Sequence, residues 1–233
     1  MTTLRFSKLA KLVLLTFSIL VTGCVSTSME YRSATTAARS EKNLKKAEEW
    51  GLKALTVVGD EQNAWVPYFL AIEVYKPQKK WEKMAEMLEI AYNRNPEQKL
   101  ERPFALDGQP VITIKQGVEA YREQEWGSLY NSAVEKFQSQ ELEKSMEILN
   151  LAIMMNPGRG ETYGTLAALY LQQENTNAAK ETANNGIKFA PDFSLNYQVL
   201  ADIATKEEDF DVAEEYYHTA ISKSEDPGPI MRQ

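Results

Sequence analysis

Cysteine and histidine are almost missing from this chain. Its 233 residues include one cysteine, Cys24, and one histidine, His218. A single thiol cannot form a disulfide within the chain, so the fold must be held together by packing alone. Zinc sites combine several Cys and His ligands, and His218 has no second histidine or cysteine near it in the sequence. We therefore interpret His218 as a surface residue and expect no metal site.

Recognisable catalytic patterns are missing as well. No glycine-rich phosphate loop follows a strand-like segment, and the Gly-Arg-Gly sequence at 158–160 is better explained as a junction between helical units. Glutamate pairs at 207–208 and 214–215 fall where a helix would turn them to solvent. The sequence therefore indicates a protein that is not an enzyme and needs no cofactor.

Long apolar runs are rare, apart from one near the start. Leu12–Val21 is apolar except for Thr16 and Ser18, and it follows a segment with three basic residues and no acidic one. A permanent membrane-spanning helix needs about 20 apolar residues, so this run is too short to be one. The pattern predicts a signal peptide over residues 1–23.

The apolar run ends in Val21-Thr22-Gly23-Cys24, which resembles the lipobox of bacterial lipoproteins. The resemblance implies that the Cys24 thiol is acylated and that cleavage leaves Cys24 as the first residue. Two or three acyl chains would hold the protein on a membrane, because each buried methylene contributes about 0.8 kcal/mol. The alternatives are a buried free thiol or an ordinary secreted protein cut nearby.

The residue after Cys24 is Val25, where an Asp would favour the inner membrane under the enteric sorting rule. We therefore expect the protein in the bacterial cell envelope, lipid-anchored at the outer membrane and facing the periplasm, rather than at the inner membrane. Residues 24–27 form a lipidated tether. At about 3.3–3.6 Å per extended residue, it would keep the first helix within roughly 15 Å of the lipid surface.

Positive charge is also in short supply. The net charge is −7, and removal of residues 1–23 leaves 23 basic and 33 acidic side chains, a net charge of −10. This balance excludes nucleic acid as an expected partner and gives no electrostatic attraction to anionic lipid. Membrane contact would depend on the lipid anchor.

Helical periodicity is abundant, and it is clearest over residues 160–191. Apolar and small residues recur there at helical spacing in two blocks, at Tyr163, Leu166, Ala167 and Tyr170, and at Ala179, Ala183, Gly186 and Ile187. Two short helices joined by a turn and followed by Pro191 resemble a tetratricopeptide (TPR) repeat, which is about 34 residues long. Ala167, Ala179 and Gly186 would let the two helices of this hairpin approach within about 8–10 Å.

The same pattern returns along the chain, because one hairpin alone cannot bury its apolar face. We predict an all-α solenoid of about five TPR-like helix-turn-helix repeats, and an unrelated Ala-rich helical bundle is the alternative. The predicted parts after the tether are two N-terminal repeats over 28–96, an insert and the start of a long helix over 97–125, three repeats over 126–227 and a tail over 228–233.

The insert near residues 97–113 is irregular and contains Pro103, Asp107-Gly108 and Pro110, which favour turns. A strand or hairpin fragment is possible at Val111–Ile114, and helical spacing then predicts a long helix over 114–138. The apolar residues of the insert either cover the end of the second repeat or form a partner-binding edge. We favour the covering role, because most apolar residues in loops pack against the body of the protein.

Resemblance to TPR arrays implies a concave surface lined by the first helix of each hairpin, where a peptide or protein segment binds. Matching positions in this sequence give the predicted groove residues Phe69, Glu73, Asn131, Glu135, Gly164, Ala168, Leu171, Gln198, Asp202 and Lys206. The set lacks the Lys and Asn arrangement with which chaperone-binding TPRs hold a C-terminal carboxylate.

These features predict a membrane-anchored adaptor or scaffold lipoprotein that binds another cell-envelope protein or peptide segment. One alternative is a binder of cell-wall glycan or a small ligand, in which aromatic residues of the insert stack on sugars together with Tyr121, Trp126 and Tyr130. Another is a structural homo-oligomer joined through the last repeat, where no capping helix follows Tyr216, Tyr217 and Ile221.

Overall fold

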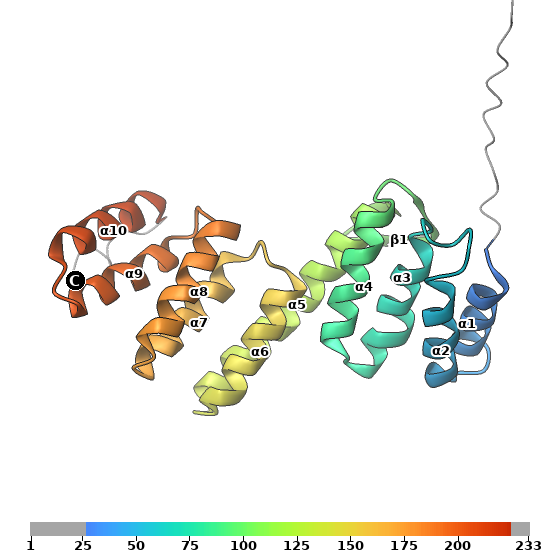
Figure 1. Cartoon of the computed structure of the whole chain (residues 1–233), viewed down its shortest axis with the longest axis horizontal. Helices are drawn as coiled ribbons and strands as arrows, with labels where there is room; N and C mark the ends of the chain where they lie inside the picture. Colours follow the sequence, from blue (N-terminus) through green and yellow to red (C-terminus); the bar gives the residue numbers. More distant parts are fainter. Residues whose placement is uncertain (1–26, 225–233) are drawn as a thin grey trace, which may run out of the picture.

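A computed structural model describes residues 27–224, and over this range the chain forms a row of helical hairpins (Figure 1). The helices are α1 (Met29–Arg39), α2 (Leu44–Ala54), α3 (Trp65–Phe69), α4 (Trp81–Arg94), α5 (Ile114–Gln138), α6 (Leu142–Met155), α7 (Gly160–Gln172), α8 (Thr176–Phe189), α9 (Ser194–Lys206) and α10 (Phe210–Lys223). Consecutive helices pair as α1–α2, α3–α4, α5–α6, α7–α8 and α9–α10, so the predicted solenoid of five TPR-like units is confirmed.

The turn inside each hairpin contains the same unusual backbone conformation. A non-glycine residue with positive φ lies in the turn after the first helix, at Lys42, Lys79, Gln140, Glu174 and Glu208. The last three lie 34 residues apart, which is the predicted period. In three of the five turns the next residue, Asn43, Asn175 or Asp209, caps the second helix through its side-chain oxygen.

Small residues set the spacing of the helices, but Gly186 does so differently from the prediction. Ala167 and Ala179 are fully buried between α7 and α8, as expected. A Cβ on Gly186 would instead lie 2.4 Å from Oδ1 of Asn196, which belongs to α9. Gly186 therefore makes room for the next hairpin rather than for the partner helix of its own.

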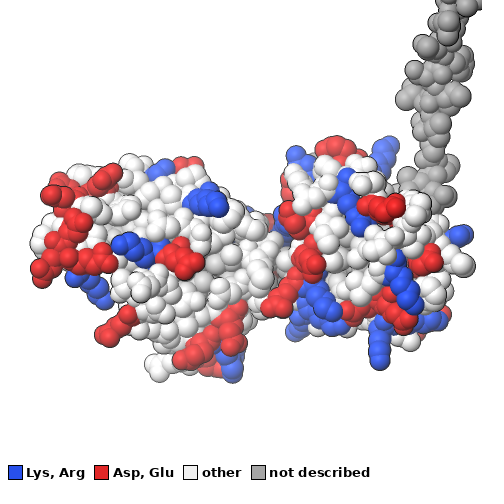
Figure 2. Space-filling model, in the orientation of Figure 1, with Lys and Arg blue, Asp and Glu red and all other residues white. Residues whose placement is uncertain are grey.

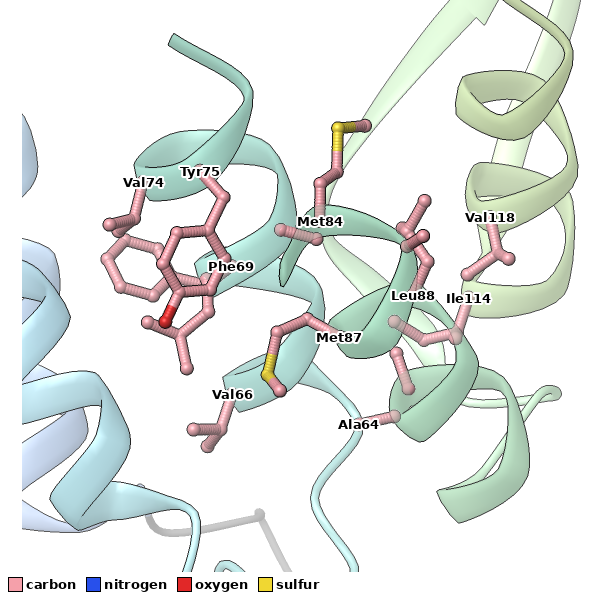
Figure 3. Packing of buried hydrophobic residues seen from close by; sticks show 14 of the residues in the cluster. Ala64, Val66, Phe69, Val74, Tyr75, Met84, Met87, Leu88, Ile114 and Val118 are labelled. Carbon is pink, nitrogen blue, oxygen red and sulfur yellow. The ribbon is translucent and has the colours of Figure 1, made fainter. Parts of the chain in front are cut away.

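The first helix of the second hairpin is not regular. After α3 the backbone widens into a π-helical segment, η1 (Leu70–Tyr75), and ends in a 3₁₀ turn, η2 (Lys76–Gln78). Figure 3 shows the buried side chains of this hairpin, with Met84 and Leu88 of α4 between α3–η1 and the start of α5. A π-helical segment changes the register of the side chains that follow it, so the sequence period is not kept through η1.

The insert is a β-hairpin, which extends the strand or hairpin fragment that the sequence allowed at 111–114. β1 (Lys99–Leu106) pairs antiparallel with β2 (Gln109–Thr113), and Phe104 lies opposite Val111. Asp107 and Gly108 both have positive φ, as a two-residue hairpin turn requires. The register shifts between Lys99 and Phe104, so the intervening residues bulge out of the ladder.

Helix α5 connects the two ends of the molecule and spans the residues that the sequence predicted. Thr113 and Gln116 form a capping box at its start, where each side chain accepts a hydrogen bond from the other residue's backbone N–H. In Figure 1, α5 runs from the β-hairpin towards the C-terminal hairpins. None of the helices within 27–224 is long and apolar enough to cross a membrane.

The start of the folded body is fixed close to the predicted tether. Ser28 caps α1, and its backbone N–H donates to Oδ2 of Asp60 over 3.1 Å. The predicted signal peptide, the acylated Cys24 and the tail over 228–233 lie outside the described residues.

Candidate functional site

An open groove lies between α7 and α9, the first helices of the last two hairpins. Its volume is about 620 Å³, and its lining combines apolar and polar side chains: Ala168, Leu171, Gln172, Leu195, Gln198, Val199, Asp202 and Lys206. Five of the predicted groove residues therefore come together here: Ala168, Leu171, Gln198, Asp202 and Lys206. Apolar side chains with a few polar groups beside them are the usual composition of a binding site.

Gly164 was predicted to line this groove and instead lies buried at its edge. A Cβ at this position would stand 2.9 Å from Cγ and Cδ2 of Leu195. Gly164 therefore allows α9 to pack closely against α7. Its contribution to a binding surface is indirect, through the position of Leu195.

The last helix, α10, stabilises the polar side of the groove through a hydrogen bond to Asp202. The Tyr217 hydroxyl of α10 donates to Oδ1 of Asp202 over 2.6 Å. Burial raises the pKa of the Asp202 carboxyl, and the hydrogen bond from Tyr217 opposes this shift. Lys206 follows one helical turn later and is exposed. Because both charge signs are present, the groove suits a segment of mixed polarity.

The β-hairpin covers part of the corresponding face of the first two hairpins. Phe69 is only 2% exposed and packs edge-to-face on Tyr31, with 5.7 Å between ring centroids. Glu73 accepts hydrogen bonds from Nε and Nη2 of Arg39 at 2.8 and 2.7 Å. The structure therefore places Phe69 in the core and Glu73 in an ion pair with Arg39, beside an open pocket of about 520 Å³ that Glu73 also lines.

Arg39 also fastens the β-hairpin to the helices. Its Nη2 donates to Glu101 of β1 over 2.7 Å, and the Tyr31 hydroxyl donates to the same carboxylate over 3.2 Å. The hydrogen bonds from Arg39 to Glu73 raise the pKa of the guanidinium. Burial and the Glu101 carboxylate raise the pKa of Tyr31. Sequence reasoning missed Arg39 and Glu101, and no local pattern links residues this far apart in the chain.

Two of the four apolar residues considered in the insert have the covering role that the sequence favoured. Val111 is 6% exposed, and Phe104 packs on Tyr121 of α5 with ring centroids 5.6 Å apart. Leu106 and Ile112 stay 41% and 40% exposed near the tip and edge of the hairpin. A partly open cavity of about 360 Å³ lies between the β-hairpin and the helices.

The middle of the chain supplies the two remaining predicted residues. Asn131 and Glu135 are exposed on α5 and do not line the groove between α7 and α9. Beside them, the Trp126 indole N–H donates to Thr162 of α7 over 2.8 Å. Partner binding at Asn131 and Glu135 therefore stays a prediction, because these residues do not line the groove.

The aromatic residues proposed for sugar stacking are largely engaged with protein groups. The Arg159 guanidinium lies 4.5 Å from the Trp126 ring centroid, and the Tyr130 ring stacks at 5.5 Å. Tyr121 packs against Tyr68 as well as Phe104. Tyr121 therefore belongs to a different group of rings from Trp126 and Tyr130, which disfavours a single glycan platform built from all three.

The last helix shows a mainly acidic outer face. Tyr216, Tyr217 and Ile221 are half-buried, whereas Phe210 and Val212 are 66% and 38% exposed. Red side chains gather at the left end of the molecule in Figure 2, where Figure 1 places α10. His218 is exposed there beside Glu214, with 3.5 Å between Nε2 and Oε1. Self-association through this end stays a prediction.

Comparison with known proteins identifies one hairpin by sequence. Residues 160–193 match the family model of the tetratricopeptide repeat. The sequence matches no curated protein. Among solved structures, the chain is similar to MamA, with 18% identity over 82% of this chain and 93% of that one and a TM-score of 0.38.

Two further solved structures are similar at the same level. YrrB, described as a TPR protein with an unusual peptide-binding site, is 14% identical over 89% of this chain and 91% of its own, with a TM-score of 0.40. PilF of Pseudomonas aeruginosa is 16% identical over 87% and 78%, also with a TM-score of 0.40. The hairpin α7–α8, which forms one wall of the open groove, is thus recognised from its sequence as a tetratricopeptide repeat.

Proposed function

We propose that this protein is a lipid-anchored adaptor of the bacterial cell envelope that binds a segment of another envelope protein between α7 and α9. The observation that carries the proposal is the groove itself. Five side chains chosen from repeat positions alone line one open concavity of about 620 Å³. A groove of mixed polarity that is open to solvent suits an extended or helical segment of a protein.

The β-hairpin supports the assignment to the C-terminal half. In the N-terminal half the hairpin already packs on the first helices through Glu101 and Phe104. The groove between α7 and α9 has no such internal cover among the described residues. Binding is therefore proposed for the last two hairpins.

Anchoring through Cys24 is proposed from the lipobox and from the position of the first helix. Ser28 is tied to Asp60, so at most four residues separate Cys24 from the folded body. At about 3.3–3.6 Å per residue, the first hairpin would lie within roughly 15 Å of the lipid surface. The outer membrane remains the proposed location, on the basis of Val25.

Mass spectrometry of the mature protein tests the anchor. We expect the N-terminal peptide to begin at Cys24 and to carry acyl chains, and the Cys24→Ala variant to keep its signal peptide. An unmodified Cys24, or a mature N-terminus elsewhere, would refute the anchor and leave the groove assignment standing.

Co-purification from detergent-solubilised envelopes tests the groove. Leu171→Glu places a charge on the apolar part of its lining, whereas Asn185→Glu places the same charge on an exposed position of α8. We expect the partner to be lost with Leu171→Glu and retained with Asn185→Glu. Equal recovery with both variants would contradict binding between α7 and α9.

A further inference from the structure

The cavity beneath the β-hairpin has the character of a second binding site. Its volume of about 360 Å³ falls in the range of about 300–1,000 Å³ typical of small-molecule sites. Its walls come from α1, α3, η1, the start of α5 and the bulged part of β1. Six aromatic side chains line it: Tyr31, Trp65, Tyr68, Phe69, Phe104 and Tyr121.

The rings already contact one another at steep angles. Tyr31 meets Phe69 at 88° and Tyr68 meets Tyr121 at 63° between ring planes. Aromatic pairs favour such edge-to-face contacts because the positive edge of one ring meets the negative face of another. A further ring of similar size would extend this arrangement into the cavity.

The charged groups of the wall cancel. Arg39 and Arg102 balance Glu73 and Glu101, and Arg39 is held by both carboxylates at 2.7 Å. The wall therefore carries no net formal charge that would select a charged ligand. An ionised carboxylate can accept about four hydrogen bonds, so the two glutamates keep acceptor positions for an O–H or N–H donor.

Three hydrogen bonds fix the wall where the β-hairpin meets the helices. The Trp65 indole N–H donates to the Lys99 carbonyl oxygen over 2.6 Å, and Glu101 receives Arg39 and Tyr31 as described above. The cavity is therefore built by contacts between distant parts of the chain. Small-molecule sites are usually preformed in this way.

We propose that this cavity binds an uncharged aromatic ring that carries one hydrogen-bond donor, such as a phenol or an indole. The ring comes either from a free small molecule or from a tyrosine or tryptophan side chain of a partner. This site is separate from the groove between α7 and α9 and does not depend on it.

Fluorine NMR of the mature protein in phospholipid nanodiscs, labelled with fluorotryptophan, tests the proposal. The chain has four tryptophans, of which Trp65 lines the cavity and Trp50, Trp81 and Trp126 do not. Titration with p-cresol should shift the Trp65 signal saturably and leave the other three in place. Benzoate, a charged ring of similar size, should bind at least tenfold more weakly.

A matched pair of variants locates the binding. Ile72→Phe adds a ring to the cavity wall and should weaken p-cresol binding at least tenfold, whereas Asn185→Phe at an exposed position of α8 should not change it. No Trp65 shift up to the solubility limit, equal binding of benzoate, or full binding by Ile72→Phe would overturn the proposal. If Ile72→Phe fails to fold, the contrast between p-cresol and benzoate on the unsubstituted protein decides.

A capped peptide with one tyrosine between glycines distinguishes the two sources of the ring. Tighter binding of the peptide than of p-cresol would assign the cavity to a partner's side chain. Tighter binding of p-cresol would assign it to a free small molecule. Either result supports the site, and loss of binding in Leu171→Glu would not be expected in either case.

Discussion

Gly186 provides a quantitative test of how neighbouring hairpins pack. A Cβ at this position would lie 2.4–2.6 Å from Oδ1, Cγ and Nδ2 of Asn196, a residue with 0% exposure. Gly127, in the interior of α5, has no such neighbour within 4 Å. Gly186→Ala and Gly127→Ala therefore make the same chemical change with and without a steric conflict.

The expected magnitudes follow from two opposing effects. Replacing glycine by alanine inside a helix stabilises a protein by about 0.5–1 kcal/mol. Overpacking a dense interior costs about 1–3 kcal/mol. We expect Gly127→Ala to raise the free energy of unfolding by about 0.5–1 kcal/mol and Gly186→Ala to lower it by about 1–2 kcal/mol.

Urea unfolding followed by circular dichroism measures both changes, using the mature chain with Cys24→Ser. Truncating Asn196 tests whether its side chain is the source of the steric conflict. The Asn196 amide is buried without a hydrogen-bond partner among the described residues, so Asn196→Ala breaks no side-chain hydrogen bond. In an Asn196→Ala background, Gly186→Ala should lose most of its cost, which a double-mutant cycle detects. Equal stability of Gly186→Ala and Gly127→Ala would refute the packing of α8 against α9.

Three further outcomes are expected. Glu101→Gln should speed amide hydrogen exchange in β1 and lower stability by about 0.5–1 kcal/mol, since the ion pair is partly exposed; unchanged exchange would show that the β-hairpin is held by other contacts. Burial raises the folded pKa of Asp202, so its protonated form stabilises the fold at low pH and this contribution is lost as pH rises through the folded pKa. The urea midpoint of Asp202→Asn relative to the unsubstituted protein should therefore rise between pH 4 and pH 7, and a constant difference would contradict the shift. Gly108→Ala, at φ +77°, should cost about 1 kcal/mol, and the measurement is again urea unfolding; no loss would argue against the two-residue turn.

Local patterns predicted much of this architecture. The 34-residue period gave the paired helices, and the apolar spacing after residue 114 gave the bounds of α5. Asp107-Gly108 marked a turn, but such a dipeptide between two strand-forming runs is also a strong hairpin signal. The β-hairpin was therefore within reach of the sequence and was only partly recognised.

Contacts between distant residues limited the prediction of binding residues. Five of the six positions predicted in the last two hairpins line one groove, because their helices are regular and close to the family pattern, and binding there stays a prediction. Phe69 and Glu73 were assigned to an open face because nothing local shows that Phe69 packs on Tyr31 or that Glu73 pairs with Arg39. The π-helical η1 adds a change of register that periodicity does not reveal.

Site-specific photo-crosslinking in growing cells tests the central claim most directly. A photoreactive amino acid at position 198 lies in the groove between α7 and α9, and the same group at position 185 lies on an exposed part of α8. The account predicts one discrete envelope protein captured from position 198 and not from position 185. Capture of the same protein from both positions, or from neither, would contradict an adaptor that binds its partner in this groove.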